Sequence, residues 1–108
     1  MDATQLLKGV LDVAVMAVLR NGDGYGYDLL RRLREVGLEE IGDASVYGTL
    51  RRLYEGGLVS SYLVPSEEGP ARRYYSLTKA GRDQLGLSIK TWRLFVETLE
   101  ELFGKEAA

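Results

Sequence analysis

Two pairs of adjacent arginines, Arg51–Arg52 and Arg72–Arg73, carry the charge that could bind a polyanion. From position 44 to 82 there are six basic and three acidic residues, a net charge of +3. Residues 1–43 have five basic and eight acidic residues (−3), and residues 83–108 have three and five (−2). The total of −2 argues by itself against nucleic acid as a partner. The clustering of positive charge still allows a local basic patch on an acidic protein.

The residue types that are missing exclude several kinds of chemistry. The chain has no cysteine and no histidine. Disulfides, zinc sites with nitrogen or sulfur ligands, and nucleophiles activated by histidine are therefore excluded. Carboxylate, lysine or tyrosine catalysis stays formally open, but no spacing points to it. The sequence predicts no enzyme, no cofactor and no metal site.

A length of 108 residues predicts one domain with a modest core, part of which a second subunit could complete. The most apolar stretch, Val10–Leu19, contains Asp12 and is much shorter than the roughly 20 residues that span a membrane. No signal peptide is visible, so we expect a cytoplasmic protein.

Three helices are expected before any strand, at about Thr4–Arg20, Tyr25–Val36 and Ala44–Glu55. In the second helix, Leu29, Leu30 and Leu33 should face inward. The run Gly24–Tyr27 lacks the preceding strand and the lysine of a phosphate-binding loop, and it is expected to start this helix. Asp43 is the expected N-cap of the third helix.

The third helix has two faces of different character. Val46, Leu50 and Leu53 form its core stripe, whereas its outward face is small at the N-terminal end and basic further along. Small residues let a helix enter the major groove, and arginine reaches phosphates or guanine edges. An ordinary solvated face is the alternative. The candidate DNA-binding residues on this helix are Ser45, Tyr47, Gly48, Arg51 and Arg52.

Two short strands, Leu58–Val64 and Ala71–Leu77, flank the loop Pro65–Pro70 and predict a hairpin. Arg72 and Arg73 stand at the start of its second strand, where a wing would touch the DNA backbone or minor groove. A charged edge that prevents aggregation is the alternative. Three helices followed by a ribbon predict a winged helix-turn-helix.

The last helix should begin after Thr78 as its cap and run to about Phe103. Its apolar residues are spaced 4, 3, 4, 3 and 4 apart, which is a heptad seam. The seam spans 18 residue steps, roughly 27 Å, and predicts a symmetric dimer. Phe95 and Leu102 widen it. The seam residues, which are the predicted dimerisation residues, are Leu85, Ile89, Trp92, Val96, Leu99 and Phe103.

The predicted fold class is α+β, mainly α, with a winged helix-turn-helix at residues 1–79 and a dimerisation helix at 80–108, in one compact unit. Trp92 lies in the middle of the seam. It could be simple packing, or it could form a platform for a planar ligand at the subunit interface. Ser88 and Phe95 lie one turn away on nearly the same face and would line such a site.

Several segments resemble the PadR family of bacterial transcriptional regulators, in its short subfamily with a single C-terminal dimerisation helix. The match at Gly69–Thr78, followed by Gly81, is the most specific, and the resemblance covers nearly the whole chain. The family usually has proline after the tyrosine of the third helix, where this chain has Gly48. The other matching segments are Leu6–Gly9, Gly24–Leu29, Ser45–Tyr47, Arg52–Leu53 and Gly57–Leu58.

The resemblance implies a homodimer joined through the last helix, with one recognition helix and one wing per subunit. It also implies repression that a small molecule relieves, and Trp92 matches a tryptophan that lines a flat pore in multidrug-responsive members. We expect a ligand-responsive repressor that binds a near-palindromic operator in double-stranded DNA and a planar hydrophobic molecule. The alternative is a winged-helix module that binds proteins and not DNA.

Overall fold

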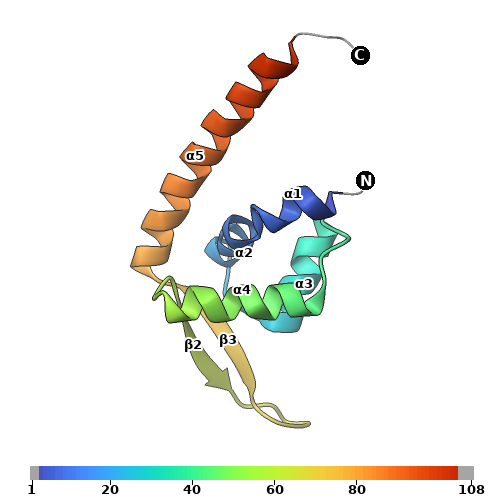
Figure 1. Ribbon diagram of the computed structural model, residues 1–108. Coiled ribbons are helices and arrows are strands. Elements are labelled where there is room, and N and C mark those ends of the chain that lie inside the picture. Colours follow the sequence, from blue (N-terminus) through green and yellow to red (C-terminus); the bar gives the residue numbers. More distant parts are fainter. Residues whose placement is uncertain (1–2, 105–108) are drawn as a thin grey trace.

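The computed structural model describes residues 3–104 and contains a helical body from which a hairpin and a long helix project (Figure 1). The chain forms α1 (Thr4–Lys8), α2 (Leu11–Arg20), β1 (Gly24–Tyr25), α3 (Gly26–Glu35) and α4 (Asp43–Glu55). The hairpin strands β2 (Val59–Val64) and β3 (Arg72–Leu77) follow, and α5 (Lys79–Phe103) completes the described part. The winged-helix architecture expected from the sequence is present.

The core lies between α2, α3 and α4, each of which buries an apolar stripe. The three predicted stripe residues of α4 are buried, as are the three leucines that were expected to face inward from α3. Because these stripes repeat at helical spacing, they could be found from the sequence. The buried residues of the three helices include Met16, Leu19, Leu29, Leu30, Leu33, Val46, Leu50 and Leu53.

The N-terminal helix is broken, whereas the sequence predicted one helix from Thr4 to Arg20. The first helix ends at Lys8, and the N–H groups of Gly9 and Val10 donate to carbonyls three residues back at 3.2 and 3.0 Å. Such a tight turn ends a helix and redirects the chain. Glycine is a poor helix former, so ending the helix at Gly9 costs little free energy.

The segment before α3 also differs from the expectation, because Gly24 and Tyr25 form a strand and only Gly26 starts the helix. The strand β1 pairs antiparallel with β3, so that Tyr25 lies opposite Tyr74. The sheet therefore has three strands in the order β1–β3–β2. A two-residue strand gives no periodic signal, which is why the sequence did not show it.

The start of α4 was predicted one residue too late. Gly42, with extended backbone angles, is the N-cap residue, and no side chain caps the helix there. Asp43 is instead the first helical residue, where its charge interacts favourably with the positive end of the helix dipole. The prediction of Asp43 as the cap was wrong, although the helix end at Glu55 was right.

The two strands form an antiparallel hairpin as predicted, and their register runs from Val59 opposite Leu77 to Val64 opposite Arg72. Each strand starts one residue later than predicted, so the loop covers residues 65–71. This register places Tyr62 opposite Tyr74, which also faces Tyr25 on the other side. A row of three tyrosines therefore crosses the sheet.

The last helix begins and ends as predicted, and Thr78 is its cap. The Thr78 hydroxyl accepts a hydrogen bond from the N–H of Gly81 at 3.0 Å and donates one to the Gly57 carbonyl at 2.8 Å. Leu85 is only 1% exposed within the single chain and belongs to the core. Leu85, the first of the predicted dimerisation residues, is therefore buried inside its own chain.

Beyond Ile89, which packs against the core, α5 extends away from the body (Figure 1). The longest dimension of the molecule is 56 Å. Within residues 3–104, no helix has both the length and the apolar character that crossing a membrane would require.

Gly81 is the point where α5 approaches the hairpin most closely, and this contact leads to a stability prediction. A Cβ at position 81 would overlap the Leu58 carbonyl oxygen and the Leu77 side chain, whereas a Cβ at Gly86 would meet nothing within 4 Å. Gly81→Ala should destabilise the fold by about 1–3 kcal/mol through overpacking. Gly86→Ala should stabilise it by about 0.5–1 kcal/mol through helix propensity.

Urea denaturation at one fixed protein concentration measures both variants, since association would shift the apparent stability. An unchanged or raised stability of Gly81→Ala would contradict the close packing described above.

Candidate nucleic-acid interface

The outward face of α4 carries the residues that were predicted to read DNA. Ser45 and Arg51 are exposed, and Tyr47 is 47% exposed. Gly48 lies among them and is half-buried. Arg51 has no ion pair or hydrogen bond to any residue within 3–104. Its guanidinium is therefore free to contact a phosphate or a base edge.

Arg52 differs from its neighbour because it is paired inside the protein. Its Nη2 lies 2.8 Å from the Asp12 carboxylate on α2 and 3.3 Å from the Thr49 hydroxyl. Both side chains of the ion pair are about half exposed, so water screens the pair and its contribution to stability is small. The pair nevertheless neutralises part of the charge that Arg52 could offer to a phosphate.

The two wing arginines point to opposite faces of β3, as successive strand residues must. The Arg72 guanidinium lies over the ring of Tyr25, 4.6 Å from its centroid. Arg73 donates a hydrogen bond to the Ser61 hydroxyl at 2.9 Å. The wing therefore presents two separate cations, each held by a neighbouring side chain, and not one basic patch.

Aromatic side chains on the outer face of the sheet form a cluster that the sequence analysis missed. The Tyr74 ring packs against Tyr25 at 5.4 Å and stacks on Tyr62 at 5.7 Å between centroids. The Tyr62 hydroxyl donates to the Asp23 carboxylate at 2.7 Å. This hydrogen bond raises the pKa of Tyr62, because ionisation would remove the proton that the phenol donates to the carboxylate.

Tyr47 lies against the start of α3. Gly26, the first residue of that helix, is buried, and a Cβ there would overlap the Tyr47 ring. Glycine at position 26 therefore makes room for the aromatic side chain of the predicted recognition helix. The Gly24–Tyr27 motif thus contacts both α4 and the wing.

The far half of α5 shows large apolar side chains on more than one face. Trp92 and Phe95 are 43% and 53% exposed, with their rings 6.3 Å apart, and Phe103 is also exposed. Val96 and Leu99 are partly buried, and Ser88 accepts a hydrogen bond from Gln84 at 3.0 Å. Leu87 and Leu94 are exposed on the side of the helix opposite the predicted seam, so exposed apolar side chains are not confined to the seam.

A family model described as the transcriptional regulator PadR-like family matches residues 15–87. The chain belongs to the PadR-like family of transcriptional regulators. The resemblance inferred from the wing signature and the helix motifs is thereby confirmed.

Three solved structures show how far the likeness to PadR-like proteins extends. A PadR-like regulator from Bacillus cereus is 31% identical, with a TM-score of 0.82 over 94% of this chain and 99% of that one. One from Eggerthella lenta is 27% identical, with a TM-score of 0.87 over 96% and 90%. Bacillus subtilis PadR, solved with operator DNA, shares the fold at 23% identity, with a TM-score of 0.68 over 74% and 46%.

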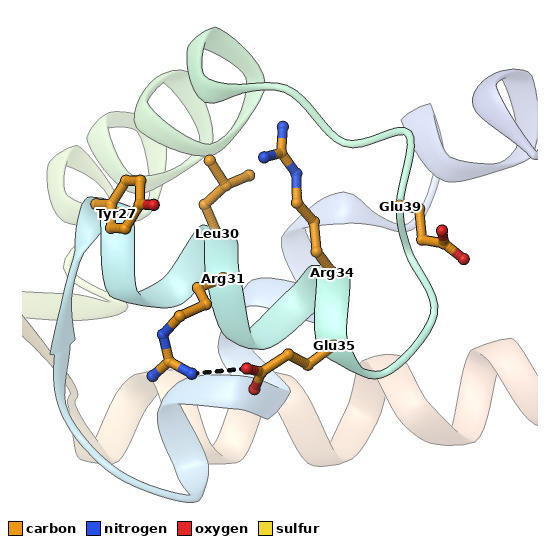
Figure 2. Close-up of a pocket in the computed structure, with 6 residues that line it drawn as sticks. All are labelled: Tyr27, Leu30, Arg31, Arg34, Glu35 and Glu39. Atoms are coloured by element: carbon orange, nitrogen blue, oxygen red, sulfur yellow. Dashed lines mark hydrogen bonds and ion pairs between the residues drawn. The ribbon is translucent and has the colours of Figure 1, made fainter.

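A shallow cavity of about 470 Å³ lies on the side of this PadR-like fold formed by α3 and the loop after it (Figure 2). Arg31 is paired with Asp28 and Glu35 at 2.7 and 2.9 Å, and the hydrogen bonds to these carboxylates raise the pKa of Arg31. Arg34 donates to the Ile41 carbonyl at 3.2 and 2.9 Å. Because both arginines have internal partners, this cavity is a poor site for an anion.

The part of the chain that the structure describes contains no group of three acidic side chains close enough to bind a metal ion. The roles predicted for Ser45, Tyr47, Gly48 and the arginines stay predictions.

The different environments of Arg51 and Arg52 lead to a prediction about salt dependence. Arg51→Ala should reduce the slope of log affinity against log salt by about 0.9 on duplex DNA, if its free guanidinium meets one phosphate. Arg52→Ala should change the slope less, because Asp12 already neutralises part of its charge.

Fluorescence anisotropy with a labelled duplex at several salt concentrations measures both slopes. Lys90→Ala, a charge change on α5, serves as the control. Equal losses of slope for the two α4 variants would show that the Asp12 pair opens on binding.

Proposed function

We propose that the protein is a homodimeric, sequence-specific DNA-binding repressor that releases its operator when a planar hydrophobic molecule binds between the two last helices. The main support for DNA binding is the free Arg51 on the exposed face of α4, in a fold that a relative solved with operator DNA shares. Such a regulator acts in the cytoplasm, and this location stays a prediction.

A second function, as a protein-binding module without DNA affinity, has one specific observation in its favour. Arg52, Arg72 and Arg73 each have a partner inside the protein, on a chain whose net charge is −2. The side-chain partners of Arg72 and Arg73 are neutral, however, so those two charges stay available to phosphates. Binding to a random duplex at low salt distinguishes the two functions, since only the DNA-binding protein should show it.

The apolar band on α5 supports the homodimer. Trp92, Phe95, Leu102 and Phe103 lie along its exposed part, and Leu102 is 77% exposed. An apolar band of this length on a helix that leaves the body is typical of a subunit interface. Ile89 and Leu85 would contribute least, because they already pack in the core of their own chain.

The dimer proposal predicts that Leu99→Glu produces monomers. A carboxylate on the seam would have to be buried without a partner, whereas the core of each chain, which includes Leu85, would keep its fold. Lys90→Glu adds a carboxylate on the charged side of α5 and should leave the dimer intact. Sedimentation at micromolar concentration measures both, with circular dichroism as the test of folding.

The same variants test whether the protein binds its operator as a dimer. Selection from a random duplex pool should enrich near-palindromes with half-sites about one helical turn, roughly 34 Å, apart. Leu99→Glu should bind these sites much more weakly. A monomeric wild-type protein, or selected sites without symmetry, would overturn the dimeric mode of binding.

Trp92 supports the ligand part of the proposal. Its ring is exposed in the single chain and lies beside Phe95, with Ser88 one turn away. On a two-fold axis, two such indoles could form the walls of a slot for one planar apolar molecule. A ligand that touches both copies of α5 would change the angle between the subunits and hence the spacing of the recognition helices.

Trp92 is the only tryptophan, so its fluorescence reports this site alone. Flat hydrophobic dyes should quench it with micromolar affinity, about −8 kcal/mol. Trp92→Ala should abolish dye binding, measured by dye fluorescence, and keep the dimer. Operator DNA should lower dye affinity by the same factor by which dye lowers DNA affinity. If a broad panel of planar aromatics leaves the emission unchanged, Trp92 serves only packing.

A further inference from the structure

The strand β1 lies between the two surfaces that are proposed to contact DNA. Tyr25 contacts the wing through Arg72, and the next residue, Gly26, lies under Tyr47 of α4. The sequence suggested only a helix start here, and the proposed function assigns these residues no role. Two consecutive residues, the last of β1 and the first of α3, therefore each touch a side chain from one of the two DNA-facing elements.

The tyrosine ring is well placed to hold Arg72. Arginine has a long side chain with many rotamers, and DNA binding must immobilise it at an entropic cost. A guanidinium 4.6 Å from the ring centroid of Tyr25 is attracted by the π electrons of that ring, which restricts its rotamers before DNA arrives. Arg72 has no carboxylate partner within residues 3–104, so its charge is held in place but not neutralised.

The ring of Tyr25 is itself fixed by the rest of the cluster. It packs against Tyr74, which stacks on Tyr62, and the Tyr62 hydroxyl is hydrogen-bonded to Asp23, two residues before Tyr25. The cluster thus closes a ring of contacts from β1 across β3 to β2 and back to the turn before β1. Backbone pairing of Tyr25 with Tyr74 adds to this connection.

We propose that Tyr25 is a positioning residue for DNA binding, whose aromatic face holds the Arg72 guanidinium of the wing ready for a phosphate while Gly26 seats Tyr47. The role rests on the proposed DNA-binding function. It requires the π face of the ring and not the phenol group, because Arg72 contacts the face.

The test is a double-mutant cycle on the selected operator with Tyr25→Leu, Arg72→Ala and the double variant. Tyr25→Leu should weaken binding about two- to tenfold, since Arg72 must then be ordered during binding. In the Arg72→Ala background, the same substitution should have no further effect on affinity. Tyr25→Phe, which keeps the ring, should bind like the unsubstituted protein. Thermal unfolding of every variant separates effects on stability from effects on DNA binding.

A series at position 25 keeps the shape of the side chain and protects the test against misfolding of Tyr25→Leu. Phenylalanine with one, two or three ring fluorines has a progressively weaker attraction for cations at nearly constant size. DNA affinity should fall along the series when Arg72 is present and stay constant in Arg72→Ala.

Equal losses in both backgrounds, or no loss at all, would overturn the positioning role and leave the proposed function intact. Absence of DNA binding by the unsubstituted protein would overturn both.

Discussion

The junction at Thr78 and Gly81 is the contact on which the arrangement of the whole molecule depends. At this point the end of α4, the base of the hairpin and the start of α5 meet. The Thr78 N–H donates to the Leu58 carbonyl at 3.1 Å, its hydroxyl donates to Gly57, and Gly81 lies against Leu58 without space for a side chain. The direction of α5 relative to the helix and wing proposed to contact DNA is therefore set by backbone contacts, which have little freedom to adjust.

Internal contacts, more than the number of basic residues, determine which positive charges the proposed DNA-binding side can offer to a phosphate. An acidic protein can offer a basic surface only where its cations point outward and are not neutralised. Arg72 and Arg73 are held by neutral partners, a tyrosine ring and a serine hydroxyl, whereas Arg52 is held by a carboxylate. Neutral partners orient a cation at little cost to its charge, so Arg72 and Arg73 keep their charges available although a neighbouring side chain holds each of them.

Several features set within one element could be predicted from the sequence, although the break after Lys8 and the cap of α4 were not, whereas the following contacts between distant segments were all missed. The stripe of α4, the cap at Thr78 and the end of α5 follow from spacing and local chemistry, and all three predictions were right. The strand β1, the Asp12–Arg52 pair and the burial of Leu85 depend on segments far apart in the chain. The row of tyrosines also depends on such contacts, because a loop one residue longer than predicted sets Tyr62 opposite Tyr74, and Tyr25 joins the row only through β1.

The rigidity of α5 explains how a ligand far from the wing could act on it. Trp92 is 14 residues beyond Thr78, and at 1.5 Å per residue the distance along the helix is about 21 Å. A rotation of about 10° centred at Trp92 would then displace the junction by roughly 4 Å, the order of the rise of one base pair. Because Leu85 and Gly81 fasten the start of α5 to the core, the body must move with the helix, and in the proposed dimer the two predicted recognition helices would change their separation. The same packing that stabilises a single chain is therefore what would transmit a change at the subunit interface to the DNA.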